Sequence, residues 1–77
     1  MIYCDLIEKT EYFATYSFSC GEGEKGIISF PLRVQSSYII KKQPEKKCSQ
    51  IWLNKLFLKY ISDFLKGIAK EKISYEC

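Results

Sequence analysis

The sequence predicts an α+β fold in which an antiparallel sheet of three to five strands, a β-meander, packs against one long amphipathic helix. Three observations predict it. The first half of the chain alternates apolar and polar residues, a glycine-rich turn interrupts that alternation, and the second half repeats apolar residues at the helical period. A sheet covered by one helix is the smallest two-layer arrangement that hides both apolar surfaces.

The strand pattern is clearest from Glu11 to Ser19, where Tyr12, Ala14, Tyr16 and Phe18 should share one side of a half-buried strand. The turn at residues 21–24 then leads into a second strand, so the two form an antiparallel hairpin. Its inner face is expected to carry Ile28, Phe30 and Leu32. Pro31 lacks a backbone donor, which indicates an edge strand or a strand end. Further strands are expected at Ile2 to Ile7, at Ser37 to Lys42 and, as a short last strand, at Lys72 to Cys77.

The helix should begin at Glu45 or Ser49, after Pro44, and end at Lys66, where Gly67 supplies a cap. A step of about 100° per residue places one set of apolar side chains on a broad face that should cover the sheet. That set is Leu53, Leu56, Phe57, Tyr60, Ile61, Phe64 and Ile68. The opposite side carries Lys55, Lys59, Ser62 and Lys66.

The composition indicates one folded domain spanning residues 1–77. The chain is 47% hydrophobic and 16% aromatic, which is too apolar for a disordered segment. It has no apolar run of about 18 residues, so no membrane partner is expected. Met1 leads into residues without the basic start and apolar stretch of a signal peptide, which favours a cytoplasmic protein.

Four cysteines, Cys4, Cys20, Cys48 and Cys77, are present. In the reducing cytosol the expectation is four free thiols, and the alternative is a pair of disulfides.

The sequence indicates no catalytic, cofactor or metal site, and hence no enzyme. There is no histidine to ligate a metal or activate a nucleophile, and no two cysteines have the spacing of a zinc knuckle. Gly21, Gly23 and Gly26 match the G-x-G-x-x-G pattern of phosphate-binding loops. Because Gly26 opens an apolar strand rather than a helix, the pattern is interpreted as a hairpin turn.

Charge is uneven along the chain. Up to Leu32 there are two lysines against five acidic residues, a net charge of −3, and from Arg33 there are ten basic against four acidic residues, a net charge of +6. The molecule should therefore have one acidic and one basic side. Nucleic-acid or other polyanion binding through the basic half is the alternative function, and a solvated surface is the simpler interpretation. The candidate residues are Lys41, Lys42, Lys46, Lys47, Lys55, Lys59 and Lys66.

The apolar arc of the helix is wider than one sheet requires, because Ile51, Leu58 and Leu65 extend it beyond the core face. Either the first strand or the carboxy-terminal tail folds over this flank, or another protein covers it. Trp52 either joins that interface or caps the end of the core. The favoured function is a non-enzymatic protein-interaction module that forms a homodimer or inhibits a larger protein.

Three segments carry a resemblance to known proteins: residues 12–18, residues 21–28 and residues 73–75. With the amphipathic helix, they resemble a group of short, uncharacterised proteins of Gram-positive bacteria and their mobile elements. The chain departs from that group in having extra residues before the first shared strand and no Trp-Tyr ending. The resemblance implies a fold and no activity. By its size, the chain is also similar to small phage-borne counter-defence inhibitors.

Overall fold

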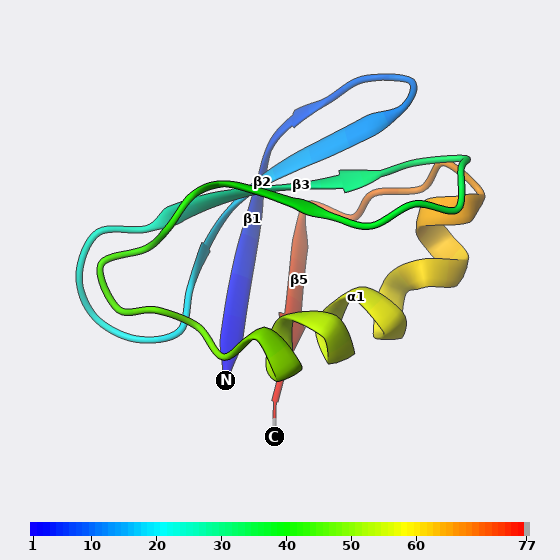
Figure 1. The fold of residues 1–77 in the computed structure, drawn as a ribbon. Helices are drawn as coiled ribbons and strands as arrows, with labels where there is room; N and C mark the ends of the chain where they lie inside the picture. The colour runs from blue at the N-terminus through cyan, green and yellow to red at the C-terminus, as the bar shows by residue number, and fades with distance from the viewer. Residues whose placement is uncertain (77) are drawn as a thin grey trace.

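The computed structural model describes residues 1–76 and contains five strands and one helix (Figure 1). Their order is β1 (Ile2–Lys9), β2 (Phe13–Ser19), β3 (Gly26–Pro31), β4 (Ile39–Lys42), α1 (Gln50–Leu65) and β5 (Lys72–Tyr75). The predicted α+β class, with a meander sheet, one helix and a short last strand, is confirmed.

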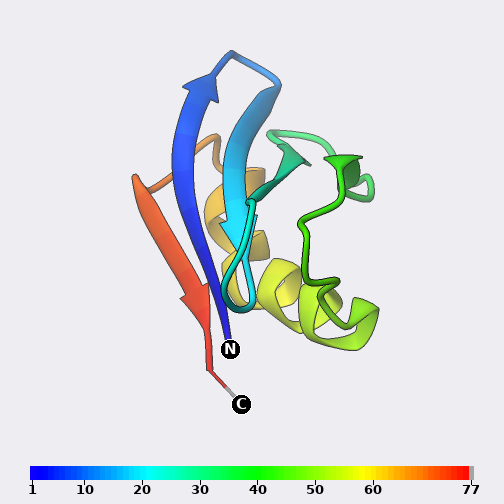
Figure 2. The same cartoon turned by 90° about the vertical axis from the view of Figure 1, so that its left-hand side faces the viewer.

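The sheet has the order β4-β3-β2-β1-β5, and all neighbouring strands are antiparallel. Strands β1 to β4 form the meander, and β5 returns after the helix to pair with the outer side of β1. Ile2 lies opposite Tyr75 in that pair, so the two ends of the described chain lie side by side (Figures 1 and 2).

The β1–β2 hairpin extends beyond the rest of the sheet (Figure 1). A register shift between Leu6 and Glu8 marks a β-bulge in β1, and such bulges bend a strand and increase its twist. Beyond the bulge β1 continues to Lys9, past the Ile7 limit predicted from sequence. Tyr12 precedes β2 and is 51% exposed, so it does not join the inner face as expected.

Pro31 is the last residue of β3, which lies between β2 and β4. The interpretation of Pro31 as a strand end is therefore confirmed, and the edge-strand alternative is wrong. The actual edge strand on this side is β4, which is shorter than the predicted Ser37 to Lys42 segment because the chain at Ser37 and Tyr38 leaves the ladder. The Tyr38 hydroxyl instead donates to Asn54 Oδ1 of the helix at 2.6 Å.

The core lies between the sheet and α1, and aromatic rings dominate it. Phe30 on β3 is fully buried, and its ring centroid lies 4.9 Å from that of Phe64 and 5.8 Å from that of Phe57, both of α1. The fully buried Tyr16 on β2 meets Phe30 edge to face at 5.6 Å and donates its hydroxyl to the Lys70 carbonyl. Burial raises the pKa of Tyr16 and keeps that hydroxyl protonated.

Helix α1 ends close to the predicted position. Lys66 is its carboxy-terminal cap, and Gly67 has a φ of 79°, the left-handed conformation that glycine adopts most easily. The Gly67 amide donates to the Phe64 carbonyl at 2.9 Å. Ile68 therefore lies outside the helix and is 46% exposed, which corrects its placement on the core face.

The glycine-rich turn joins β2 to β3, which confirms the hairpin interpretation of the G-x-G-x-x-G pattern. Gly26 is buried as the first residue of β3, and a side chain there would collide with the Lys42 carbonyl and the Pro44 nitrogen. The glycine allows the segment before the helix to approach the sheet closely.

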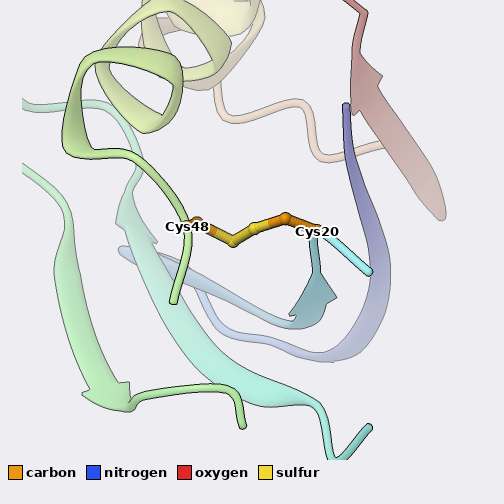
Figure 3. Close-up of a disulfide and its surroundings, with 2 residues drawn as sticks. All are labelled: Cys20 and Cys48. Carbon is orange, nitrogen blue, oxygen red and sulfur yellow. A yellow bond between two sulfur atoms is a disulfide. The ribbon is translucent and has the colours of Figure 1, made fainter. Parts of the chain in front are cut away.

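Cys20 and Cys48 form a disulfide that links the end of β2 to the residue just before the helix cap Ser49 (Figure 3). Their Cα atoms lie 5.7 Å apart, within the range that a disulfide spans. The expectation of four free thiols is therefore wrong for these two cysteines, because the β2–β3 turn and the segment before α1 pack together. Cys4 is a free, buried thiol, and the prediction for Cys77 lies outside the described residues.

Candidate protein-binding surface on the helix

The outer stripe is a line of three apolar side chains, Ile51, Leu58 and Leu65, that recur every seven residues along α1. Ile51 and Leu58 are each 65% exposed, and Leu65 is 42% exposed. Seven residues are close to two helical turns, so these side chains lie almost in line at intervals of about 10.5 Å. Neither the first strand nor the carboxy-terminal segment up to Glu76 covers them.

The inner face of α1 is complete without the outer stripe. Leu53, Leu56 and Phe64 are buried against the sheet, and Phe57 and Tyr60 are partly buried against the same core. At about 100° per residue, the outer stripe points away from these side chains. The exposure of all three side chains shows that no described element covers this side of α1.

The outer stripe belongs to a heptad pattern. If Ile51, Leu58 and Leu65 occupy the a positions, Asn54 and Ile61 fall at the d positions, where coiled-coil helices meet their partners. Ile61, predicted on the core face, is partly exposed and is not among the side chains that pack against the buried core, which corrects that placement. Asn54 is exposed, and its side-chain oxygen accepts the bond from Tyr38. The surface is thus a narrow seam of apolar residues interrupted once by a polar one.

A lysine flank, formed by Lys55, Lys59 and Lys66, borders one side of the stripe, and all three side chains are exposed. Lys59 Nζ donates to the Ser74 carbonyl of β5 at 3.0 Å, which places this flank on the β5 side of the helix. On the opposite side the β3–β4 connection contacts the helix, where the Tyr38 hydroxyl donates to Asn54 Oδ1 at 2.6 Å. A molecule that covers the stripe therefore meets lysines on its open side.

Trp52 is only partly exposed and packs against the core. Its position agrees with the alternative that it caps the end of the core. Of the four predicted partner-binding residues, the structure aligns Ile51, Leu58 and Leu65 in one stripe, and it places Trp52 outside that line.

The seven candidate polyanion-binding lysines are distributed over β4, the segment before the helix, and α1. Lys42 forms an ion pair with Glu24 across 2.6 Å, which holds the pKa of that carboxyl below its usual range. At the opposite edge of the sheet, Asp5 of β1 forms an ion pair with Lys72 of the edge strand β5. Two ion pairs thus join the acidic half of the sequence to the basic half, so the halves do not separate cleanly into two sides.

Cys4 is unsuited to nucleophilic chemistry. Burial, with a smaller contribution from the Asp5 carboxylate, raises the pKa of its thiol to about 12. The thiolate is the reactive form, so at neutral pH this side chain is an inert part of the core.

A hollow with a volume of about 280 Å³ lies beside the β1 bulge. It is lined by Asp5, Leu6, Ile7, Glu8, Lys9, Glu71 and Lys72. Asp5 is already engaged there by Lys25 at 3.4 Å and Lys72 at 3.6 Å. Across residues 1–76 no three His, Cys, Asp or Glu side chains are grouped as metal ligands would be.

No helix in the described part of the chain has both the length and the apolar character needed to cross a bilayer. No protein-family model matches the sequence, and neither a curated protein nor a solved structure matches it.

Proposed function

We propose that the chain is a non-enzymatic protein-binding module that binds another protein through the outer stripe and inhibits that protein by occupying its surface. The observation that carries the proposal is the exposure of Ile51 and Leu58, each 65%, on a helix whose core face is already complete. Fully burying a leucine or isoleucine side chain is worth about 1.5 to 3 kcal/mol. Association would supply that burial, because the fold itself does not.

A different protein fits the surface better than a second copy of the chain. In a symmetric antiparallel pair of α1 helices, each lysine flank would lie against the flank of its partner, because a twofold interface brings the same patches together. Like charges so placed oppose association. The single acidic residue of α1, Asp63, lies 3.8 Å from Lys70 and offers little compensation.

The test is a capture experiment with Leu58→Glu/Leu65→Glu and the wild-type chain, each crosslinked in host cells and analysed by quantitative mass spectrometry. We expect the double variant to lose a partner that the wild type retains reproducibly. Ile39→Glu is the matched control, because Ile39 is 54% exposed on β4 and does not lie on the helix. Circular dichroism checks that all three chains fold. Equal recovery of every partner by the folded double variant would refute the proposal.

Polyanion binding is the second candidate. Within residues 1–76, Lys42 is the only one of the seven candidate lysines in an ion pair, and Lys59 donates to the Ser74 carbonyl, so the other five keep their ammonium groups available to phosphates. Phosphate contacts of this kind weaken steeply as salt rises. Failure of the chain to bind a heparin column at low salt would exclude this function.

The cytoplasmic location stays a prediction, and the Cys20–Cys48 disulfide makes it testable, because disulfides are rare in reducing compartments. Alkylation of the chain in intact cells, followed by mass spectrometry, would report the bond. If the chain is cytoplasmic, we expect Cys20 and Cys48 to be alkylated as free thiols in the cell.

A further inference from the structure

We infer that the element recognised by the outer stripe is an amphipathic α-helix of the partner, with acidic residues beside its apolar seam. This inference rests on the proposed function and names the chemistry of the partner. Two features of α1 carry it: the spacing of the stripe and the sign of the charge beside it.

The spacing favours a helix. Ile51, Leu58 and Leu65 recur at about 10.5 Å, and a partner helix repeats its own seam over the same two-turn interval. An extended peptide presents side chains on one face every 6 to 7 Å or so, which does not match this repeat. A lipid surface suits a broad apolar face, whereas this seam is narrow and carries the exposed, hydrogen-bonded Asn54.

The charge favours an acidic helix. Tyr38 of the β3–β4 connection donates to Asn54 on one side of the seam, so the open side of the seam is the one that faces the lysine flank. Two lysines of that flank lie within α1, against the single acid Asp63, and Lys66 follows at its cap. Exposed ion pairs add only about 0.2 to 1 kcal/mol each, so the lysines select the partner and the apolar seam supplies most of the affinity.

The experiment uses two synthetic helical peptides with the same leucine seam. One has glutamate at its e and g positions, and the other has lysine there. Each is titrated into the isotopically labelled chain, with NMR amide shifts to locate the contact and fluorescence anisotropy to measure affinity. We expect the glutamate peptide to shift amides of α1, to bind about tenfold tighter than the lysine peptide, and to lose that advantage as salt rises.

Two variants sharpen the test. Lys55→Glu/Lys66→Glu should reverse the preference between the peptides, whereas the control Lys41→Glu, which changes β4, should leave it unchanged. Leu58→Glu should abolish binding of both. Equal affinities for the two peptides would overturn the acidic partner, and stronger binding to vesicles containing phosphatidylserine than to either peptide would overturn the helix.

The inference and the proposed function fail in different ways. If neither peptide shifts α1, but capture of the native partner still depends on Leu58 and Leu65, the helical partner is refuted and the proposed function stands. If capture does not depend on those leucines, the proposed function itself is refuted.

Discussion

The two faces of α1 carry similar apolar side chains in opposite surroundings. Leu56 on the inner face is fully buried, and Leu58, two residues later on the outer face, is 65% exposed. Only the inner face meets the aromatic cluster around Phe30. The sheet therefore leaves part of the apolar surface of this helix uncovered. Changes on the inner face should therefore alter stability, and changes on the outer face should alter association.

The largest expected difference separates two leucines of the same helix. Leu56→Ala removes buried atoms and leaves a cavity, so we expect the free energy of unfolding to fall by about 2 to 5 kcal/mol. Leu58→Ala should change it by no more than about 0.5 kcal/mol, because the side chain has few contacts to lose. Urea denaturation of both variants measures the two values. Equal losses would show that the stripe belongs to the core.

The next prediction concerns the Cys20–Cys48 disulfide, which joins the segment just before α1 to the end of β2 and so holds the start of the helix, with both of its faces, against the sheet. Closing a loop between residues 28 apart in sequence removes enough chain entropy to contribute roughly 3 to 4 kcal/mol. The start of the helix lacks two other local sources of stability, because Ser49 makes no side-chain cap bond and the first turn has no acidic residue. We expect Cys20→Ser/Cys48→Ser to lose about that much stability and to exchange the amide of Leu53, which donates to the Ser49 carbonyl at 3.1 Å, faster.

Hydrogen exchange measured by NMR would locate that loosening, with the amide of Phe64 as the internal control at the opposite end of α1. An unchanged exchange rate at Leu53, together with a lower free energy of unfolding, would mean that the disulfide stabilises only the turn between β2 and β3.

The sequence predicted the helix well, because its apolar period and its Gly67 stop are local signals. The same periodicity identified the three stripe residues as surplus to one sheet. The Cys20–Cys48 bond could not be predicted, since it depends on how the β2–β3 turn folds against the segment before α1. Ile68 was misplaced because the helical projection was continued past the glycine that ends the helix. The β1 bulge was missed because neither Leu6 nor Ile7 carries a signal for an extra residue.

Cys4 is a buried thiol on the inner face of the sheet, and like Leu56 it should affect stability rather than association. The thiol has an ordinary pKa of about 9 and a pKa of about 12 in the fold. The folded chain therefore holds this proton more tightly than the unfolded chain does. Its contribution to stability is complete below pH 9 and is lost as pH rises from 9 toward 12, by about 1.4 kcal/mol per pH unit.

The measurement is the free energy of unfolding at pH 8 and about pH 10 for the wild type and for Cys4→Ala. We expect the wild type to fall more steeply than the variant over that interval. Burial also raises the pKa of Tyr16 and of Tyr38, but both tyrosines are present in both chains, so only the smaller contribution of the Cys4 charge to the Tyr16 pKa differs between them. Equal slopes would mean that Cys4 is solvated in solution.

The smallest expected effect on stability comes from Asn54, the polar residue in the seam of the outer face. Asn54→Leu removes the exposed hydrogen bond from Tyr38, so the free energy of unfolding should fall by about 0.5 kcal/mol or less. The same change joins the apolar stripe to Ile61 and removes the polar residue that restricts which helices can pair with it. We expect the variant to self-associate at concentrations where the wild type is monomeric, as measured by analytical ultracentrifugation.

Asn54→Ala is the control, because it removes the same bond without extending the apolar surface as far. If both variants stay monomeric, the lysine flank alone prevents self-pairing. If both associate, the Tyr38 bond, rather than the width of the stripe, is what keeps two copies apart.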